Sequence, residues 1–417
     1  MDDASIFASG AAHSDLAWLA EALWGGLEGV TVSAGWFPPA GSTTVERYLV
    51  VPSRRRPRLL LPDETPAGRE ALWANRGIRA PRARWARSAM GLAYHPGLWD
   101  FVTRGLHRVG VHASDPDVPL LSRVLANILG EERVVLVVNV RPPSPFRKPV
   151  AQVLRPDGRL LAYVKVAPND VTKRGVAREA RALRALAERD DGRLLVPTLL
   201  HHGSWETREI LVTEPLPRDV RRYPAGEGPP SIDVTREVAG LSARTRSALG
   251  TSRYWQELRR RAAAHSSDAA RMSFDALLLA FLDAAEDRSG AIDTIFGTWH
   301  GDWSPWNLGF AGGRVVAWDW EYSTDGVPLG FDVLHFHFQS AFIGEGRPVS
   351  EAFARARAGA RAPLVALGVE PDPTADAHVA EITLRYLEAM ALGAEPNTRF
   401  LSGIGDVLLE RARGSEG

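Results

Sequence analysis

The chain has 417 residues, with 50 basic and 50 acidic side chains and no cysteine. The balanced charge argues against a general nucleic-acid surface, and the absence of cysteine excludes disulfides and thiolate metal sites. The first residues are acidic, unlike a signal peptide, and no uncharged apolar run is long enough to span a bilayer. We therefore expect a cytoplasmic protein without membrane or nucleic-acid partners.

The first 130 residues mix helical and strand-like patterns and are too apolar to be disordered. The expected elements are an amphipathic helix at Leu16–Leu27, a pair of strands near Arg47–Val51 and Arg58–Leu61, helical segments holding Trp73, Trp85 and Trp99, and a helix at Leu120–Leu129. This α/β region is either a separate domain or an extension packed on the part of the chain that follows.

Residues 131–213 are rich in strand patterns. The expected strands are Val134–Val140, Val150–Leu154, Leu160–Lys165 and Ile210–Thr213. A loop at residues 141–148 joins the first two strands and contains no glycine.

Lysine is rare, because only Lys148, Lys165 and Lys173 occur among the 50 basic residues. Where arginine serves as the general cation, a lysine is a candidate for a task that needs a compact ammonium group. Lys165 ends a strand pattern and is the best placed of the three. The alternative is a solubilising lysine on an edge strand.

A helix is expected at residues 176–188, with Val176, Leu183 and Leu186 on one stripe. Glu179 lies on the same apolar stripe, where a carboxylate is costly unless a cation meets it. Lys165, 14 residues upstream, is the candidate partner. The alternative is a pair with an arginine of the same helix on a solvated face.

Residues 300–321 read HGDWSPWNLGFAGGRVVAWDWE and predict a hairpin. Its strands are Leu308–Phe310 and Val315–Trp318, so Asn307 and Asp319 should meet at the open end, beside Asp302. Two carboxylates and a carboxamide make an oxygen-rich site suited to Mg²⁺, with one carboxylate left to handle a proton.

The arrangement of His300, Asp302, Asn307 and Asp319 resembles the catalytic segment of the kinase-like phosphotransferases, in their aminoglycoside phosphotransferase and choline kinase branch. The resemblance implies an α+β, bilobal, protein-kinase-like fold. The small antiparallel β lobe would be residues 131–213 and the large helical lobe residues 214–417. The resemblance does not cover the extra N-terminal α/β region, residues 1–130. It also implies ATP, Mg²⁺ and a small-molecule hydroxyl acceptor, such as an aminoglycoside, a sugar or an amino alcohol.

By this resemblance, Asp302 orients and deprotonates the acceptor hydroxyl, while Asn307 and Asp319 hold the metal. Glu321 adds a metal or water contact, or is a surface residue. Lys165 contacts the phosphates of ATP, with Glu179 as its partner.

The resemblance also assigns weaker parts of the nucleotide site. Arg147 and Lys148, in the glycine-free loop, are either phosphate contacts or exposed turn residues. The segment Glu214–Leu216 resembles the hinge between lobes, whose backbone hydrogen-bonds adenine.

Among the other residues near this motif, Asp332 and the two tryptophans each have two possible roles. Asp332 either caps the helix that follows it or supports the catalytic loop from behind. His300 is expected to orient its neighbours, and His335 to pack in the core. Trp303 and Trp306 either stack on an acceptor ring or pack in the core.

Two other functions fit the same residues. One is a kinase of Ser or Thr in a peptide, and the other is a pseudokinase-type protein that binds without turnover. A P-loop enzyme is excluded, because no lysine completes the G-x-x-x-x-G-K-[ST] pattern.

Overall fold

The computed structural model describes residues 15–53, 57–63, 66, 106–141, 144–189, 192–224, 226–264 and 272–413. These residues form two compact units, one within Met1–Val176 and Thr198–Pro215, the other within Ala177–Pro197 and Leu216–Gly417. The helical segments predicted around Trp73, Trp85 and Trp99 lie outside the described residues. Within the described ranges, no helix is long and apolar enough to span a bilayer.

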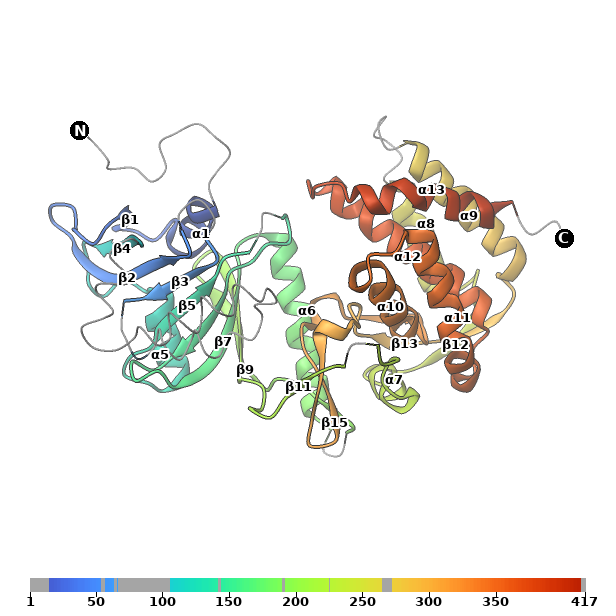
Figure 1. The fold of residues 1–417 in the computed structure, drawn as a ribbon, viewed down its shortest axis with the longest axis horizontal. Coiled ribbons are helices and arrows are strands. Elements are labelled where there is room, and N and C mark those ends of the chain that lie inside the picture. The colour runs from blue at the N-terminus through green and yellow to red at the C-terminus, as the bar shows by residue number, and fades with distance from the viewer. Residues whose placement is uncertain are drawn as a thin grey trace. The chain divides into compact units, whose positions relative to one another are not determined.

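The first unit is built on a nine-stranded sheet of order β1-β4-β2-β3-β5-β6-β7-β10-β9, in which every neighbouring pair is antiparallel (Figure 1). The strands are β1 (Val30–Ala34), β2 (Thr43–Val51), β3 (Leu59–Pro62), β4 (His107–Ala113), β5 (Val135–Asn139), β6 (Val150–Leu154), β7 (Leu160–Ala167), β9 (Leu199–Trp205) and β10 (Arg208–Thr213).

The strands of the N-terminal region continue the sheet of residues 131–213. Leu59 and Leu60 of β3 pair with Asn139 and Val138 of β5. The predicted pairing of β2 with β3 is confirmed. One sheet shared by both parts of the chain favours the extension over a separate N-terminal domain.

Two helices, α1 (Asp15–Trp24) and α5 (Leu121–Leu129), share a core with one face of this sheet. Alternate strand residues point to opposite faces, so Val50 joins this core while Leu49 joins a smaller cluster. Both helices were predicted, α1 as a longer segment.

Lys165 lies in the interior of the sheet, on β7, between Val150 of β6 and Leu211 of β10. The alternative of an edge-strand lysine is therefore wrong. Helix α6 (Asp170–Ala187) follows β7 and confirms the helix predicted at residues 176–188.

The second unit is mainly helical. Its elements include α7 (Ile232–Ala239), α8 (Arg253–Ala264), α9 (Met272–Ser289), α10 (Phe331–Gln339), α11 (Val349–Leu367), α12 (Pro371–Ala391) and α13 (Thr398–Ala412). Two small sheets accompany them, β11 (Arg221–Arg222)-β14 (Leu308–Ala311)-β15 (Arg314–Ala317)-β8 (Leu194–Leu195) and β12 (Thr245–Ala248)-β13 (Asp293–Trp299)-β16 (Thr324–Pro328).

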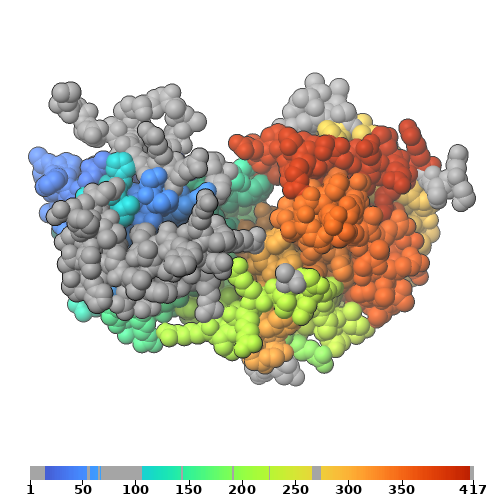
Figure 2. All heavy atoms as spheres, in the orientation of Figure 1, coloured from blue at the N-terminus to red at the C-terminus, as the bar shows by residue number. Residues whose placement is uncertain are grey.

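The helices of this unit share one large apolar core, which includes Trp255, Phe281 and Phe331. In the space-filling view, orange and red residues, from the C-terminal part of the chain, make up much of the visible surface of the unit (Figure 2). An antiparallel β unit and a helical unit confirm the predicted α+β fold class.

Candidate active site

The predicted hairpin is present as β14 and β15. Leu308 pairs with Ala317, and Gly312 and Gly313 form the turn with φ of 56° and 75°. The Trp318 N–H donates to the Asn307 carbonyl over 3.2 Å, which extends the ladder by one step. Asn307 and Asp319 therefore stand at the open end of the hairpin, as the spacing predicted.

Asp302 is held by the side chain of Asn307. Asn307 Nδ2 donates to Asp302 Oδ2 over 2.7 Å and to the Asp302 carbonyl over 3.0 Å. The Asp302 side chain is 26% exposed, so a small molecule can reach it. The same hydrogen bonds leave the amide oxygen of Asn307 as the atom that can serve a cation.

His300 orients this loop and remains neutral. The Asp302 N–H donates to His300 Nδ1 over 3.1 Å, which places the ring proton on Nε2, 3.1 Å from the carbonyl of Trp318. Burial lowers the pKa of His300 to about 4, although the charges of Asp302 and Asp319 oppose the shift. A neutral orienting residue agrees with the prediction.

Asp332 supports the loop from behind. Its carboxylate accepts from the N–H of His300, over 2.9 and 3.2 Å, and from that of Gly301, over 3.3 Å. The alternative of a helix cap is wrong, because Gly330 is the N-cap of α10. Burial raises the pKa of Asp332 to about 7, against the effect of these hydrogen bonds.

Asp319 has a left-handed backbone, with φ 70° and ψ 57°, directly before the short helix Trp320–Tyr322. Asp and Asn tolerate this conformation better than other side chains, and such outliers gather at functional sites. The carbonyl of Glu321 accepts a 2.8 Å hydrogen bond from Arg178 Nε, which fixes the backbone that follows Asp319.

The acidic side chains of this segment all influence the pKa of Tyr322. Burial raises the pKa of Tyr322, and the charges of Glu321, Asp302 and Asp319 raise it further. No group of three His, Asp or Glu side chains is placed to hold a metal in the ranges given above. A cation here would depend on the Asn307 oxygen, Asp319 and oxygens from outside the protein, a donor set that fits Mg²⁺.

Trp303 packs in the core of this segment. It is 1% exposed, and its ring centroid lies 5.3 Å from that of His300 and 6.4 Å from that of Trp320. The alternative in which Trp303 stacks on an acceptor ring is wrong.

Two neighbours of the loop were missed. His335, predicted only to pack, does so but also places Nε2 3.5 Å from Asp302 Oδ1. Burial lowers its pKa despite this carboxylate. Arg385, on α12, donates to the Gly301 carbonyl over 2.7 Å. Nothing in the sequence marks one arginine among so many.

In the first unit, Arg147 and Lys148 are 5% and 3% exposed, so the reading as exposed turn residues is wrong. Arg147 pairs with Asp15 over 3.0 Å, and its guanidinium lies 4.1 Å from the ring centroid of Trp18. It joins the glycine-free loop to α1.

Glu179 is 3% exposed, on the face of α6 that also buries Val176 and Leu183. Its predicted place on the apolar stripe is confirmed, and the solvated-face alternative is wrong. Lys165 and Glu179 lie in different units, so their pairing stays a prediction.

The chain passes from the first unit to the second between Pro215 and Leu216, within the predicted hinge. The Glu214 N–H donates to the Thr198 carbonyl over 2.9 Å, and Pro215 has no N–H. The backbone groups of this segment that can still serve as the predicted adenine contacts are therefore its carbonyls and the Leu216 N–H.

Comparison with solved structures finds similarity to a thermostable mutant of the aminoglycoside phosphotransferase APH(4)-Ia, at 14% identity and a TM-score of 0.48, over 71% of this chain and 100% of that one. The spectinomycin phosphotransferase APH(9)-Ia matches at 12% identity and a TM-score of 0.40, over 72% of this chain and 99% of that one. The choline kinase LicA from Streptococcus pneumoniae matches at 13% identity and a TM-score of 0.44, over 70% of this chain and 98% of that one.

No protein-family model matches the sequence, and no curated protein matches it.

Proposed function

We propose that the protein is an ATP-dependent phosphotransferase that moves the γ-phosphate of ATP to a hydroxyl group of a small molecule. The 2.7 Å hydrogen bond from Asn307 to Asp302 carries the proposal. It fixes an accessible carboxylate at the open end of a hairpin that also bears Asp319.

Asp302 is the proposed base. The Asn307 amide donates a hydrogen bond to Oδ2 of Asp302, and the backbone N–H of Asp302 donates to His300. These two bonds fix the orientation of the Asp302 carboxylate. It orients the acceptor hydroxyl toward the γ-phosphate and takes its proton as the new P–O bond forms and the bond to ADP breaks. Positioning of this kind accounts for much of the rate in phosphoryl transfer.

The proposed Mg²⁺ ligands are the Asn307 amide oxygen and the Asp319 carboxylate, with Glu321 as a further contact. Mg²⁺ takes one or two protein carboxylates together with phosphate oxygens and water. When bound, the ion neutralises charge on the phosphate oxygens. The left-handed backbone at Asp319 is the local feature that supports its role.

Lys165 is the proposed phosphate contact, with Glu179 as its partner and Lys148 as a second cation. The adenine edge offers an amino donor and a ring-nitrogen acceptor. The Glu214 carbonyl and the Leu216 N–H supply the matching groups, since the Glu214 N–H is bound to Thr198.

The test measures ADP release from MgATP with panels of aminoglycosides, amino alcohols, sugars and peptides that contain Ser or Thr. We expect one of the small-molecule classes to stimulate release above the acceptor-free rate. Lys165→Ala should abolish this activity, whereas Lys173→Ala, the same change on α6, should leave it intact.

Two results would overturn the proposal. Stimulation only by peptides with Ser or Thr would indicate a peptide kinase. Nucleotide binding without stimulation by any acceptor would indicate a binding protein that does not turn over.

A further inference from the structure

Arg385 connects α12 to the loop that carries Asp302. Its Nη1 donates to the carbonyl of Gly301 over 2.7 Å, although the two residues are 84 positions apart. The Arg385 side chain is 20% exposed. A charge-assisted hydrogen bond that is largely shielded from water is stronger than an ordinary surface contact.

The peptide group between Gly301 and Asp302 is thereby held from both sides. Arg385 binds its carbonyl, and His300 Nδ1 accepts from its N–H over 3.1 Å. The preceding N–H, that of Gly301, is bound by Asp332. Because this peptide leads directly into the Cα of Asp302, its orientation sets the direction in which the Asp302 side chain leaves the backbone.

The guanidinium of Arg385 is itself fixed by three contacts. Its Nε donates to Glu381 Oε1 over 3.0 Å, one turn earlier on α12. Its central carbon lies 4.2 Å from the ring centroid of Trp299 and 5.6 Å from that of Tyr322. The planar guanidinium of arginine can donate hydrogen bonds in two directions and stack on aromatic rings at the same time. The ammonium group of lysine cannot make all of these contacts at once.

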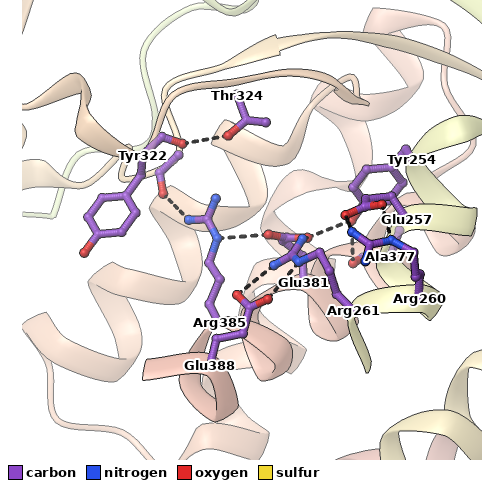
Figure 3. A network of polar contacts seen from close by, with 11 residues as sticks. Tyr254, Glu257, Arg260, Arg261, Tyr322, Thr324, Ala377, Glu381, Arg385 and Glu388 are labelled. Carbon is purple, nitrogen blue, oxygen red and sulfur yellow. Dashed lines mark hydrogen bonds and ion pairs between the residues drawn. The ribbon is translucent and has the colours of Figure 1, made fainter. Parts of the chain in front are cut away.

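Glu381 is anchored in turn by α8 (Figure 3). Arg261 Nη1 binds Glu381 Oε2 over 3.2 Å, while Nε and Nη2 of Arg261 hold Glu388 over 2.8 and 2.9 Å. Burial raises the pKa of Glu381, but the charges of Arg385 and Arg261 and their hydrogen bonds take it below its ordinary value. Glu381 is therefore a stable anion under Arg385.

We propose that Arg385, held by Glu381, is a positioning residue that fixes the Gly301–Asp302 peptide and so aims the Asp302 carboxylate. The role rests on the proposed function, in which Asp302 is the base.

The experiment compares Arg385→Gln, Arg385→Lys and Glu381→Gln with Arg411→Gln. Arg411 is a matched control, because its side chain is 15% exposed and pairs with the buried Asp376 of α12, the helix that also carries Arg385. Two readouts are measured, kcat and KM with the acceptor found above, and amide hydrogen exchange of the segment 299–307 in the unliganded protein.

We expect Arg385→Gln to lower kcat about 100-fold, the loss that a misplacement of about 1 Å can cause, with the KM for ATP changed by less than about twofold. Arg385→Lys should have a kcat between those of the wild type and Arg385→Gln. Glu381→Gln should lower kcat in the same way as Arg385→Gln. Exchange should increase at residues 299–307 in Arg385→Gln. Arg411→Gln should lower Tm and change neither readout.

Unchanged exchange at residues 299–307 in Arg385→Gln would overturn the inference. So would a loss of kcat no larger than that of Arg411→Gln. If the wild-type protein phosphorylates no acceptor, the proposed function fails, and the exchange comparison still decides whether Arg385 orders the loop.

Discussion

The carboxamide of Asn307 donates a 2.7 Å hydrogen bond to the carboxylate of Asp302. One side chain thus serves two tasks in the proposed reaction, because its nitrogen aims the base while its oxygen is left for the metal. The two tasks can be separated by their dependence on Mg²⁺.

Asn307→Ala should lower kcat about 100-fold and raise the Mg²⁺ concentration needed for half-maximal rate, since a metal ligand and a support of the base are both lost. The measurement is a set of steady-state rates across Mg²⁺ concentrations. Asn397→Ala, which removes the cap of α13, is the control for lost stability alone. An unchanged Mg²⁺ requirement in Asn307→Ala would contradict the assignment.

The contacts of the two ring nitrogens of His300 can be tested separately. Asparagine offers an oxygen about where Nδ1 accepts from Asp302, whereas glutamine offers a donor about where Nε2 meets Trp318. If the orientation of Asp302 limits the rate, His300→Asn should keep a larger share of kcat than His300→Gln. Equal losses in the two variants would show that the Nδ1 contact has no special role.

Gly301 adopts a backbone conformation that residues with a side chain rarely take. Its φ is 84°, and an added Cβ would lie 2.2 Å from the carbonyl oxygen of Tyr322. Gly301→Ala should lower the free energy of unfolding by about 3 kcal/mol, from backbone strain and steric overlap together.

Gly312 provides the control for that experiment. Its φ is 56°, but an added Cβ would meet nothing within 4 Å. Gly312→Ala should cost only about 1 kcal/mol, from backbone conformation alone. Chemical denaturation of both variants makes the comparison, and equal losses would contradict the predicted overlap with Tyr322.

Asp332 makes stability depend on pH. Burial raises its pKa from 3.8 to about 7, so between these values the folded protein keeps a proton that the unfolded chain has lost. The contribution of Asp332 to the free energy of unfolding therefore falls as pH rises through this window and is constant above it.

Asp332→Asn removes this titration, while other groups still titrate in both proteins. The free energy of unfolding of the wild type, minus that of the variant, should fall by on the order of 3 kcal/mol between about pH 4 and pH 8. Urea denaturation at several pH values measures the difference. A difference that does not vary with pH would contradict the raised pKa.

Local patterns predicted much of the site. The turn residues Gly312 and Gly313 predict the hairpin, and the hairpin places Asn307 and Asp319 at one end. The apolar period of α6 likewise placed Glu179 in a buried position. These features depend on residues close together in the chain.

Features that depend on distant residues were missed. Arg385 reaches Gly301 from α12, and Arg147 reaches Asp15 from another part of the first unit. No spacing rule connects such residues, and the abundance of arginine hides the ones with special contacts. The pairing of β3 with β5 could not be predicted either, because the sequence pattern of a strand does not specify which strand it pairs with.

The account depends most directly on Asp302 as the base. The decisive measurement uses Asp302→Asn, with mass spectrometry of the acceptor for phosphate transfer and calorimetry for ATP binding. We predict that the variant binds ATP as the wild type does and transfers phosphate at least about 1,000-fold more slowly. A variant that phosphorylates the acceptor at the wild-type rate would contradict the central claim.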